Sequence, residues 1–498
     1  MFSKILIANR GEIATRIART CREMGIATVA VYSEADRSSP HLYAADEAVC
    51  VGLAQASESY LHGESILAAA RRTGADAIHP GYGFLSENAT FARAVADAGL
   101  TFIGPAPDAL SAVGNKIVAR RTVAQLGVPV IPALEDLATD PEAVRAQVAS
   151  LGYPLLIKAA AGGGGKGMRI VREEAELVEA LSAAQREAAA AFAEGTVYVE
   201  RFLERPHHVE VQILGDTAGN IVHLGERECS IQRRYQKIVE EPPSPAVSES
   251  LRREMTRAAL TVARAAGYDN AGTVEFILDN DGNFYFLEVN ARLQVEHPIT
   301  EWITGLDLVH EQIRIAAGEA LGFQQDDIRR NGHALECRLY AEDAAHGFLP
   351  SPGHILAWHA PQGPGVRVDS GVESQTEVPI YYDPMIAKIS TWGADREQAR
   401  RRMAGALRQT AILGLTTNLP FLIDLVDHPA FAAGDTHTGF LPEHFPNWQP
   451  GEQPHRLAAA LAASLHRDPH RNGDGQTSLP AQDPPTPWRQ LGGWRLGS

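Results

Sequence analysis

The chain has 498 residues, enough for about two to four domains with substantial hydrophobic cores. Hydrophobic residues make up 45% of it and charged residues 21%, which are ordinary proportions for a globular protein. The formal net charge of −16 argues against a general nucleic-acid-binding protein, because phosphate binding needs a basic surface. No apolar run reaches the roughly 18 residues that a membrane-spanning helix needs, so we expect no membrane protein.

Two further features indicate the cell compartment. The first residues lead straight into a strand pattern, and no signal or transit peptide precedes them. The cysteines have neither a CxxC motif nor the spacing of a zinc site; they are Cys21, Cys50, Cys229 and Cys337. Reduced thiols are typical of the cytosol, so we expect a cytoplasmic protein.

The N-terminal part alternates between short apolar runs and helical periodicities. We expect strands at 4–8, 28–32, 48–51 and 77–79, and helices at 13–24 and 64–73. This alternation predicts a parallel sheet covered by helices, a Rossmann-like α/β domain. Only Asn9-Arg10-Gly11 follows the first strand, so the glycine fingerprint of a dinucleotide site is absent. The glycine-rich loop 79–88 lies where such sheets bind ligands, but its spacing alone does not exclude a plain turn.

A glycine-rich segment lies between two predicted strands. The first strand ends at Lys158, the glycines at 162–165 and Lys166 follow, and the second strand covers 168–171. This is not a P-loop, because Lys166 is followed by glycine rather than by Ser or Thr, and by a strand rather than a helix. We predict a hairpin flap whose backbone N–H groups close over a triphosphate; a flexible linker is the alternative.

Polar residues lie on the elements around this segment. Lys116 is near the start of a helix predicted at 112–127. Glu200 lies on a strand, and it and the apolar linker after it suit an adenine base, although these residues alone do not establish that role. His208 lies on the next strand, and a histidine in such a position more often has a structural role than a ligand-binding one. Further helices are expected at 173–192, 248–266, 301–317 and 395–410.

Residues 232–237, Gln-Arg-Arg-Tyr-Gln-Lys, form the densest basic cluster in this acidic chain. Such a run is usually a solvated face. Here the local charge opposes the global charge, which favours an anion site at which Lys237 or a neighbouring arginine complements phosphate.

Residues 273–298 carry most of the functional information. Two β-rich runs flank Asp-Gly at 281–282, which favours a two-residue hairpin turn. This turn places Glu275 directly opposite Glu288, with Asn290 on the same face. Facing carboxylates repel each other unless a cation lies between them, and these oxygen donors suit Mg²⁺ bound with a nucleotide phosphate. A solvated strand face is the alternative, although the apolar neighbours favour burial.

Two charged residues follow these oxygen donors. Arg292 suits a bidentate grip on a small planar anion, and Glu296 is placed to remove a proton from it. A surface ion pair is the alternative for each. From about 331 the chain becomes rich in β-strand patterns, and Arg338 alternates there with apolar neighbours. From about 447 the composition predicts a poorly ordered tail with one short helix at 456–466.

Taken together, these motifs resemble those of biotin carboxylase, a member of the ATP-grasp superfamily. The shared strings lie at 5–14, 79–88, 162–168, 229–234, 288–298 and 336–343. The resemblance implies a mixed α/β and α+β fold of three domains and a tail. These are an N-terminal Rossmann-like domain at 1–114, an ATP-grasp domain at 115–330 with a mobile glycine-rich flap at about 131–203, a C-terminal biotin carboxylase domain at 331–446, and the tail at 447–498, which resembles the start of a linker domain.

The resemblance also implies the roles of individual residues. ATP would be bound by Lys116, Lys158, Gly163, Gly164, Gly165, Lys166, Glu200, Arg201, Leu203, His208, Tyr235, Glu275 and Glu288. Mg²⁺ or Mn²⁺, two ions in all, would be held by Glu275, Glu288 and Asn290, and bicarbonate by Lys237, Arg292, Gln294 and Val295. The catalytic residues would be Lys237, Arg292, Glu296 as general base and Arg338, which would stabilise the biotin enolate.

Two positions depart from the family pattern. Tyr235 stands where the family usually has histidine, which leaves that ATP contact open. Arg201 stands where lysine is common, but the contact there is expected through the backbone.

The implied reaction has two steps. Bicarbonate, deprotonated by Glu296, attacks the γ-phosphate of ATP and forms carboxyphosphate. This breaks down to CO₂ and phosphate, the phosphate takes the proton from N1′ of biotin, and the resulting enolate captures CO₂. No Met-Lys-Met biotinylation motif occurs in the sequence, so we expect biotin on a carrier protein rather than on these residues. The expected partners are a biotin carboxyl carrier protein, carboxyltransferase subunits and a second copy in a homodimer.

The acyl acceptor is not identified by the sequence, because the carboxyltransferase selects it. Residues 486–497 resemble the start of the linker domain in α subunits that act on 3-methylcrotonyl- or propionyl-CoA. A free-standing subunit of acetyl-CoA carboxylase, in fatty acid biosynthesis, is the other expectation. Alternatives are a pyruvate or urea carboxylase component, a ligase like carbamoyl-phosphate synthase, and a silent nucleotide-binding scaffold.

Overall fold

The first layer of the protein is a five-stranded parallel sheet. The computed structural model describes residues 1–138, 140–160, 168–192 and 195–451. The sheet has the order β3-β2-β1-β4-β5, formed by β1 (Lys4–Ile7), β2 (Ala27–Ser33), β3 (Glu47–Gly52), β4 (Ala77–His79) and β5 (Thr101–Phe102). The helices beside it are α1 (Gly11–Glu23), α2 (His41–Ala44), α3 (Gly63–Thr73) and α4 (Ala89–Asp97). The predicted Rossmann-like domain is thereby confirmed.

Strand β1 shows why this sheet is covered on both faces. Ile5 and Ile7 pack into one hydrophobic cluster with α1, whereas Leu6 packs into another with α3. Because successive side chains point to opposite faces, a continuous apolar run is buried on both sides.

Two predicted helices are each broken in two. The expected helix at 112–127 is α5 (Pro107–Gly114) followed by α6 (Lys116–Gln125), because Asn115 is extended and its side chain caps the N–H of Val118. The expected helix at 301–317 is α10 (His297–Thr304) followed by α11 (Leu308–Ala316). Gly305, with φ of 75°, ends the first of these, and Asp307 caps the second. A hydrophobic period alone does not detect such caps.

The flap is a small sheet with its own core. Its order is β6-β9-β7-β8, with β6 (Ala133–Leu134), β7 (Leu155–Ala159), β8 (Arg169–Val171), β9 (Val197–Arg201), α7 (Pro141–Val148) and α8 (Leu177–Phe192). Antiparallel pairing of β7 with β8 confirms the predicted strand–glycine–strand hairpin. Residues 161–167, and with them Gly163–Lys166, lie outside the described residues. Leu155, Ile157 and Val199 pack with α8 in a cluster separate from the other cores.

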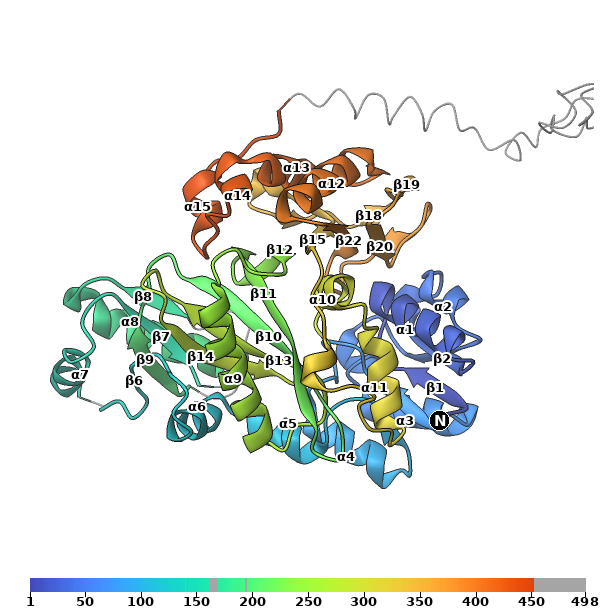
Figure 1. The fold of residues 1–498 in the computed structure, drawn as a ribbon, viewed down its shortest axis with the longest axis horizontal. Helices are drawn as coiled ribbons and strands as arrows, with labels where there is room; N and C mark the ends of the chain where they lie inside the picture. Colours follow the sequence, from blue (N-terminus) through green and yellow to red (C-terminus); the bar gives the residue numbers. More distant parts are fainter. Residues whose placement is uncertain (139, 161–167, 193–194, 452–498) are drawn as a thin grey trace, which may run out of the picture. The chain divides into compact units, whose positions relative to one another are not determined.

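An eight-stranded antiparallel sheet joins the middle of the chain to its C-terminal part (Figure 1). Its order is β14-β13-β10-β11-β12-β15-β22-β20, with β10 (His207–Gly215), β11 (Ile221–Arg233), β12 (Gln236–Glu241), β13 (Asn270–Leu278), β14 (Phe284–Asn290), β15 (His333–Tyr340), β20 (Val366–Ser370) and β22 (Met385–Gly393). The β12–β15 pair is the junction, and it brings residues near 240 beside residues near 336. Helix α9 (Glu249–Ala265) packs on β10, β11 and β13.

Helices cover the other end of this sheet. In Figure 1, α12 (Arg396–Gln409) and α13 (Leu419–Asp427) lie over β15 and β22, and α14 (Pro429–Ala433) and α15 (Phe440–His444) follow. Three two-stranded ribbons complete this part: β16 (Glu342–Asp343) with β17 (Leu349–Pro350), β18 (Gly353–His354) with β21 (Glu377–Val378), and β19 (Ala357–His359) with β23 (Ala411–Leu413). The domain boundaries at 114, 330 and 446 stay predictions, and the helix expected at 456–466 lies outside the described residues.

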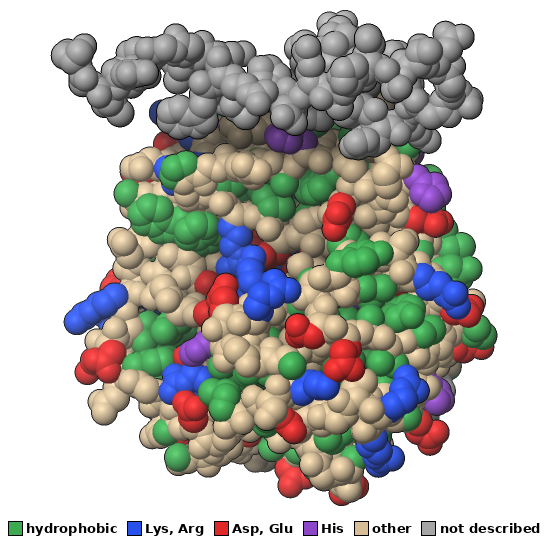
Figure 2. All heavy atoms as spheres, turned by 90° about the vertical axis from the view of Figure 1, so that its right-hand side faces the viewer, with side chains coloured by type: hydrophobic (Ala, Val, Ile, Leu, Met, Phe, Trp, Pro, Cys, Tyr) green, Lys and Arg blue, Asp and Glu red, His purple; other side chains and the backbone are tan. Residues whose placement is uncertain are grey.

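The described surface and helices agree with the composition. Figure 2 shows one face, on which basic and acidic side chains are interspersed rather than gathered by sign. No helix in the described part of the chain is both long enough and apolar enough to cross a membrane.

Candidate active site

The β13–β14 hairpin places Glu275 directly opposite Glu288, as expected, but the predicted two-residue turn is wrong. The N–H of Asp279 donates to the carbonyl of Asn283 at 2.9 Å, so three residues form the loop. Gly282, with φ of 84°, supplies the left-handed conformation that such a loop needs. A bulge at Leu287 shifts the register back by one residue, because Glu275 pairs with Glu288 whereas Phe276 pairs with Phe286. The two offsets cancel, and both carboxylates share one face.

Each of the two carboxylates is held by its own cation. Glu288 forms an ion pair with Lys116 at 2.6 Å. Glu275 is bonded to Lys237 at 2.9 Å, to His208 at 2.8 Å and to the amide nitrogen of Asn290 at 2.7 Å. The expectation of one cation between the two acids is therefore not met by the protein's own side chains. Two carboxylates and an amide on adjacent positions remain a suitable donor set for a divalent ion.

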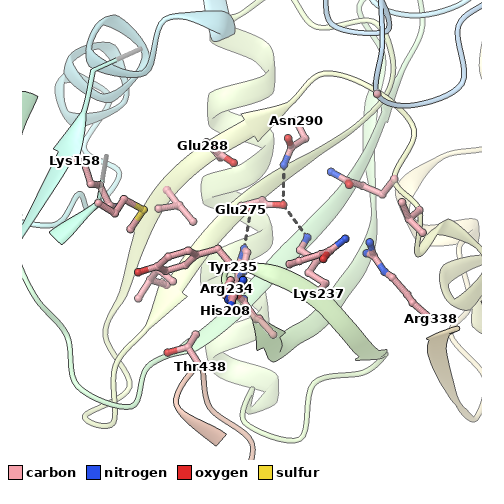
Figure 3. A pocket seen from close by; sticks show the side chains of 18 of the residues that line it. Lys158, His208, Arg234, Tyr235, Lys237, Glu275, Glu288, Asn290, Arg338 and Thr438 are labelled. Carbon is pink, nitrogen blue, oxygen red and sulfur yellow. Dashed lines mark hydrogen bonds and ion pairs between the residues drawn. The ribbon is translucent and has the colours of Figure 1, made fainter. Parts of the chain in front are cut away.

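These residues line a cleft with a volume of about 1280 Å³ (Figure 3). The structure brings together at its wall the predicted residues Lys116, Lys158, Glu200, Arg201, Leu203, His208, Tyr235, Lys237, Glu275, Glu288, Asn290, Arg292, Gln294, Val295 and Arg338. Glu296 lies just behind the wall, fully buried. Figure 3 shows Lys158 at one end of the cleft and Arg338 at the other.

At the Arg338 end, the charges form one buried network. Lys237 contacts three carboxylates, those of Glu210 at 2.7 Å, Glu275 at 2.9 Å and Glu296 at 2.8 Å. Arg338 donates to the other oxygen of Glu296 at 2.9 Å. Burial alone would raise the pKa of Glu296, but Lys237 and Arg338 outweigh it and hold that pKa well below its usual value. Glu296 is therefore an ionised carboxylate at neutral pH, without a proton of its own.

The loop at 79–88, left open by its sequence, belongs to the site. Tyr82, Gly83 and Phe84 line the cleft. Glu87 accepts from the guanidinium of Arg292 at 2.9 Å and from the N–H of Ala291 at 3.0 Å. Arg292 also donates to the side-chain oxygens of Gln294 and Asn290. This loop therefore orients the predicted anion-binding arginine.

At the Lys158 end, the polar side chains come from the flap and from α6. Lys158 contacts Glu200 at 2.5 Å across the β7–β9 pair. Apolar side chains of Ile131, Leu156 and Leu203 line the wall beside them. A flat apolar wall next to one carboxylate and two ammonium groups suits a base carrying a phosphate chain.

The basic cluster at 232–237 is a tight hairpin between β11 and β12. Arg234 and Tyr235 form its tip, both with positive φ, and Tyr235 is 54% exposed. Arg233 is paired with Glu342 at 2.6 Å, whereas Lys237 points into the cleft network. Arg233 is therefore not part of a solvated face, and the anion site at Lys237 stays a prediction.

Several residues that support the site were not identified from the sequence. Lys388 of β22 donates to the carbonyl oxygen of Val295 at 2.6 Å and contacts Glu12 of α1 at 3.2 Å. Glu12 in turn accepts from the hydroxyl of Tyr82. A lone lysine in the apolar string Met-Ile-Ala-Lys-Ile was the available hint, because a buried lysine needs partners.

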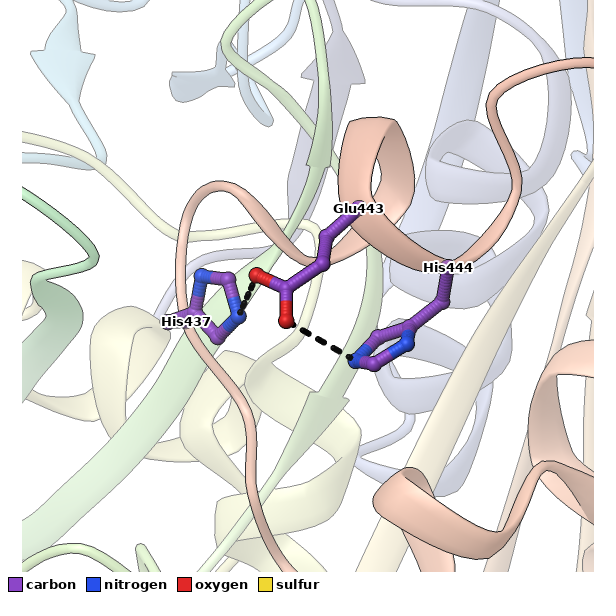
Figure 4. Close-up of side chains that lie close together, drawn as sticks. All are labelled: His437, Glu443 and His444. Atoms are coloured by element: carbon purple, nitrogen blue, oxygen red, sulfur yellow. Dashed lines mark ion pairs between the residues drawn. The ribbon is translucent and has the colours of Figure 1, made fainter.

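A second cluster is formed by His437, Glu443 and His444 (Figure 4). Nδ1 of His437 accepts from the N–H of Gly439 at 3.1 Å, so Nε2, which faces Glu443 at 3.3 Å, carries the proton. Arg205 also pairs with Glu443 at 3.0 Å. A nitrogen that carries a proton and an arginine paired with the carboxylate both oppose metal binding, so we assign no metal site to this cluster.

Comparisons with known proteins agree with this geometry. Three family models match: "Biotin carboxylase, N-terminal domain" at 1–110, "Carbamoyl-phosphate synthase L chain, ATP binding domain" at 115–324 and "Biotin carboxylase C-terminal domain" at 336–443. A biotin carboxylase of Nostoc sp. is 52% identical over 89% of this chain and 99% of the relative. The mitochondrial methylcrotonoyl-CoA carboxylase subunit alpha of Dictyostelium discoideum is 47% identical over 99% of this chain and 70% of the relative.

One solved structure is similar over nearly the whole described chain. It is the biotin carboxylase domain dimer of the 2-oxoglutarate carboxylase from Hydrogenobacter thermophilus, in complex with MgADP, ADP and bicarbonate. It is 45% identical, covers 91% of this chain and 100% of its own, and has a TM-score of 0.87.

Proposed function

Because this chain belongs to the biotin carboxylase family of ATP-grasp ligases, we propose that its cleft carboxylates N1′ of biotin with ATP and bicarbonate. The observation that carries this proposal is the buried network of Lys237, Glu296 and Arg338 at one end of the cleft. It combines an ionised carboxylate with fixed positive charge, which is what deprotonation of a small anion requires.

Bicarbonate is bound at this end by Lys237, Arg292, Gln294 and the backbone at Val295. Glu296 takes the bicarbonate proton, and the nucleophile then attacks the γ-phosphate of ATP to give carboxyphosphate and ADP. The depressed pKa of Glu296 beside Lys237 and Arg338 makes it a weak base. An anion that binds Lys237 draws this cation away from Glu296 and so strengthens the base.

Biotin is bound next to Arg338. Phosphate released from carboxyphosphate takes the proton from N1′, and Arg338 stabilises the enolate that captures CO₂. Tyr82 and Gly83, from the loop near Arg338, supply the wall that excludes water from this step.

The nucleotide is bound at the other end, by Lys116, Lys158, Glu200, Arg201, Leu203 and His208. The glycines at 163–165 and Lys166, which lie outside the described residues, are expected to bind its phosphates. Tyr235 is a further contact, at the edge of the cleft. The oxygens of Glu275, Glu288 and Asn290 are hard donors of the kind that Mg²⁺ or Mn²⁺ prefers, and these residues would hold the ion. A bound divalent ion supplies charge neutralisation of the phosphates.

The partners are inferred from the relatives. The similar 2-oxoglutarate carboxylase domain is a dimer, and we expect a homodimer here. We also infer a biotin carboxyl carrier protein and a carboxyltransferase. The alignment with methylcrotonoyl-CoA carboxylase subunit alpha over 99% of this chain supports an acyl-CoA carboxylase of that type. Free thiols at all four cysteines support the cytoplasm.

A single assay tests the proposal against the ligase alternative. Bicarbonate-dependent ATP hydrolysis is measured with and without free biotin. Stimulation by biotin is expected, because the second step consumes carboxyphosphate productively. A carbamoyl-phosphate synthase-like ligase responds to its own nitrogen donor instead, and a silent scaffold shows no turnover under either condition.

A further inference from the structure

A row of charged side chains crosses the eight-stranded sheet at Arg338. Glu240 of β12 is directly opposite Glu336 of β15, and Arg338 of β15 is directly opposite Lys388 of β22. Residues paired across an antiparallel ladder share a face, and so do residues two apart on one strand. The four side chains therefore lie on one face, and each is at most 7% exposed.

Glu240 anchors the guanidinium of Arg338. Its Oε1 accepts from Arg338 Nε at 2.6 Å, while Nη2 of the same guanidinium donates to Glu296 at 2.9 Å. The guanidinium is planar, so two charge-assisted bonds from different nitrogens fix both its position and its plane. Glu240 itself is not part of the cleft wall.

Glu336 is a buried acid without a partner. It is 0% exposed, and neither of its carboxyl oxygens has a hydrogen-bond partner among the described residues. The same holds for Oε2 of Glu240. Ionised, Glu336 would be a bare anion next to a second one, which is strongly unfavourable. A proton on Glu336 removes that charge and provides a donor for the free oxygen of Glu240.

The surroundings of Glu336 agree with this protonation. The charged groups that face it are Lys388 on β22, Glu240 on β12, Arg338 on its own strand and Glu296 before α10. Burial dominates and raises the pKa of Glu336 well above its usual value. Lys388 does not neutralise it, because that ammonium is bonded to Val295 and Glu12.

We propose that Glu240 and a protonated Glu336 form a positioning pair that holds Arg338 in place for the biotin step. Glu336 donates its proton in a hydrogen bond to Glu240, and Glu240 directs its charge to Arg338 Nε. The pair thereby fixes the group that meets the enolate without touching any substrate. This inference rests on the proposed function, in which Arg338 stabilises that enolate.

The main test compares Glu240→Gln with Glu241→Gln. Glu241 is the next residue on β12, on the opposite face, 2% exposed and paired with Arg396 and His333, both at 2.7 Å. Glu240→Gln should lower the biotin-stimulated rate by about 10–100-fold, the equivalent of one charge-assisted hydrogen bond. ATP hydrolysis without biotin should stay within about twofold. Glu241→Gln should lower the melting temperature and change both rates alike.

Glu336 is tested by a conservative rescue. Glu336→Gln keeps an N–H donor toward Glu240 and should retain the biotin-stimulated rate. Glu336→Leu has a similar size but no donor, and should lose that rate selectively. Equal behaviour of Glu240→Gln and Glu241→Gln, or of the two Glu336 variants, overturns the positioning pair. Absence of any biotin stimulation in the unmodified protein overturns the proposed function instead.

Discussion

The two ends of the cleft are built on two different sheets. At the bicarbonate end, Lys237 and Arg338 extend from adjacent strands of the eight-stranded sheet, and every carboxylate they contact is almost fully buried. At the nucleotide end, Lys158 and Glu200 belong to a sheet with strands of two to five residues and a separate core. Under the proposed function, the groups that act on the reacting atoms lie on the larger sheet, whereas those that contact ATP lie on a small sheet with a separate core.

The largest effect on activity is expected at the bicarbonate end of the cleft. Glu296→Gln keeps the shape of the side chain but cannot accept the bicarbonate proton. Bicarbonate-dependent ATP turnover should fall by about 10²–10⁴-fold, the usual contribution of a general base. Steady-state kinetics measure this, with the melting temperature as the check on folding. Undiminished turnover would remove Glu296 from the reaction.

Two matched leucine-to-alanine substitutions, one in each sheet, test whether the flap has a core that unfolds separately. Leu155 of β7 in the flap and Leu339 of β15 in the larger sheet are both 0% exposed. Leu155→Ala should destabilise the flap by about 2–5 kcal/mol, raising KM for ATP while the main thermal transition is unchanged. Leu339→Ala should shift that main transition. Hydrogen exchange resolves the two regions, and equal protection losses in both would mean that the flap is not an independent unit.

The metal ligands lie between the two ends. Glu288→Gln removes one carboxylate. Loss of a residue that merely supports a metal ligand lowers metal affinity about 10–100-fold, so we expect the apparent affinity for Mg²⁺ to fall by at least that much. Asp281→Asn, in the exposed loop of the same hairpin, is the control and should leave the Mg²⁺ dependence unchanged. Magnesium titration of ATP turnover and of nucleotide binding reads out both variants.

The smallest effect concerns pH. The pKa of Glu336 is raised above its unfolded value of about 4.3, so the native state keeps a proton that the unfolded chain loses. The contribution of this proton to the free energy of unfolding is fully present below the unfolded pKa. Above it, the contribution declines by about 1.4 kcal/mol per pH unit until the folded pKa is reached. Glu336→Gln lacks this dependence. Urea unfolding of both proteins between about pH 5 and 7 tests this; a constant difference contradicts a protonated Glu336.

Local structural features could be predicted from the sequence. The β1–α1 alternation, the glycine hairpin at 158–171 and the pairing of Glu275 with Glu288 all follow from periods and turn residues within about thirty neighbours. Even there, the correct pairing came from two cancelling offsets, a longer loop and a bulge at Leu287. The broken helices at Asn115 and Gly305 show the same limit, because a cap is one residue within an otherwise continuous period.

The sequence by itself determined the family, the order of the elements and most of the polar residues that line the cleft. Only the tertiary structure decided which charges neutralise one another. Glu87 meets Arg292, and Lys388 meets Val295 and Glu12, through contacts between segments about 90 to 380 residues apart. Such pairs depend on the β12–β15 junction and the packing of α1 on β22. A buried charge must find a partner, but its local sequence does not say where that partner lies.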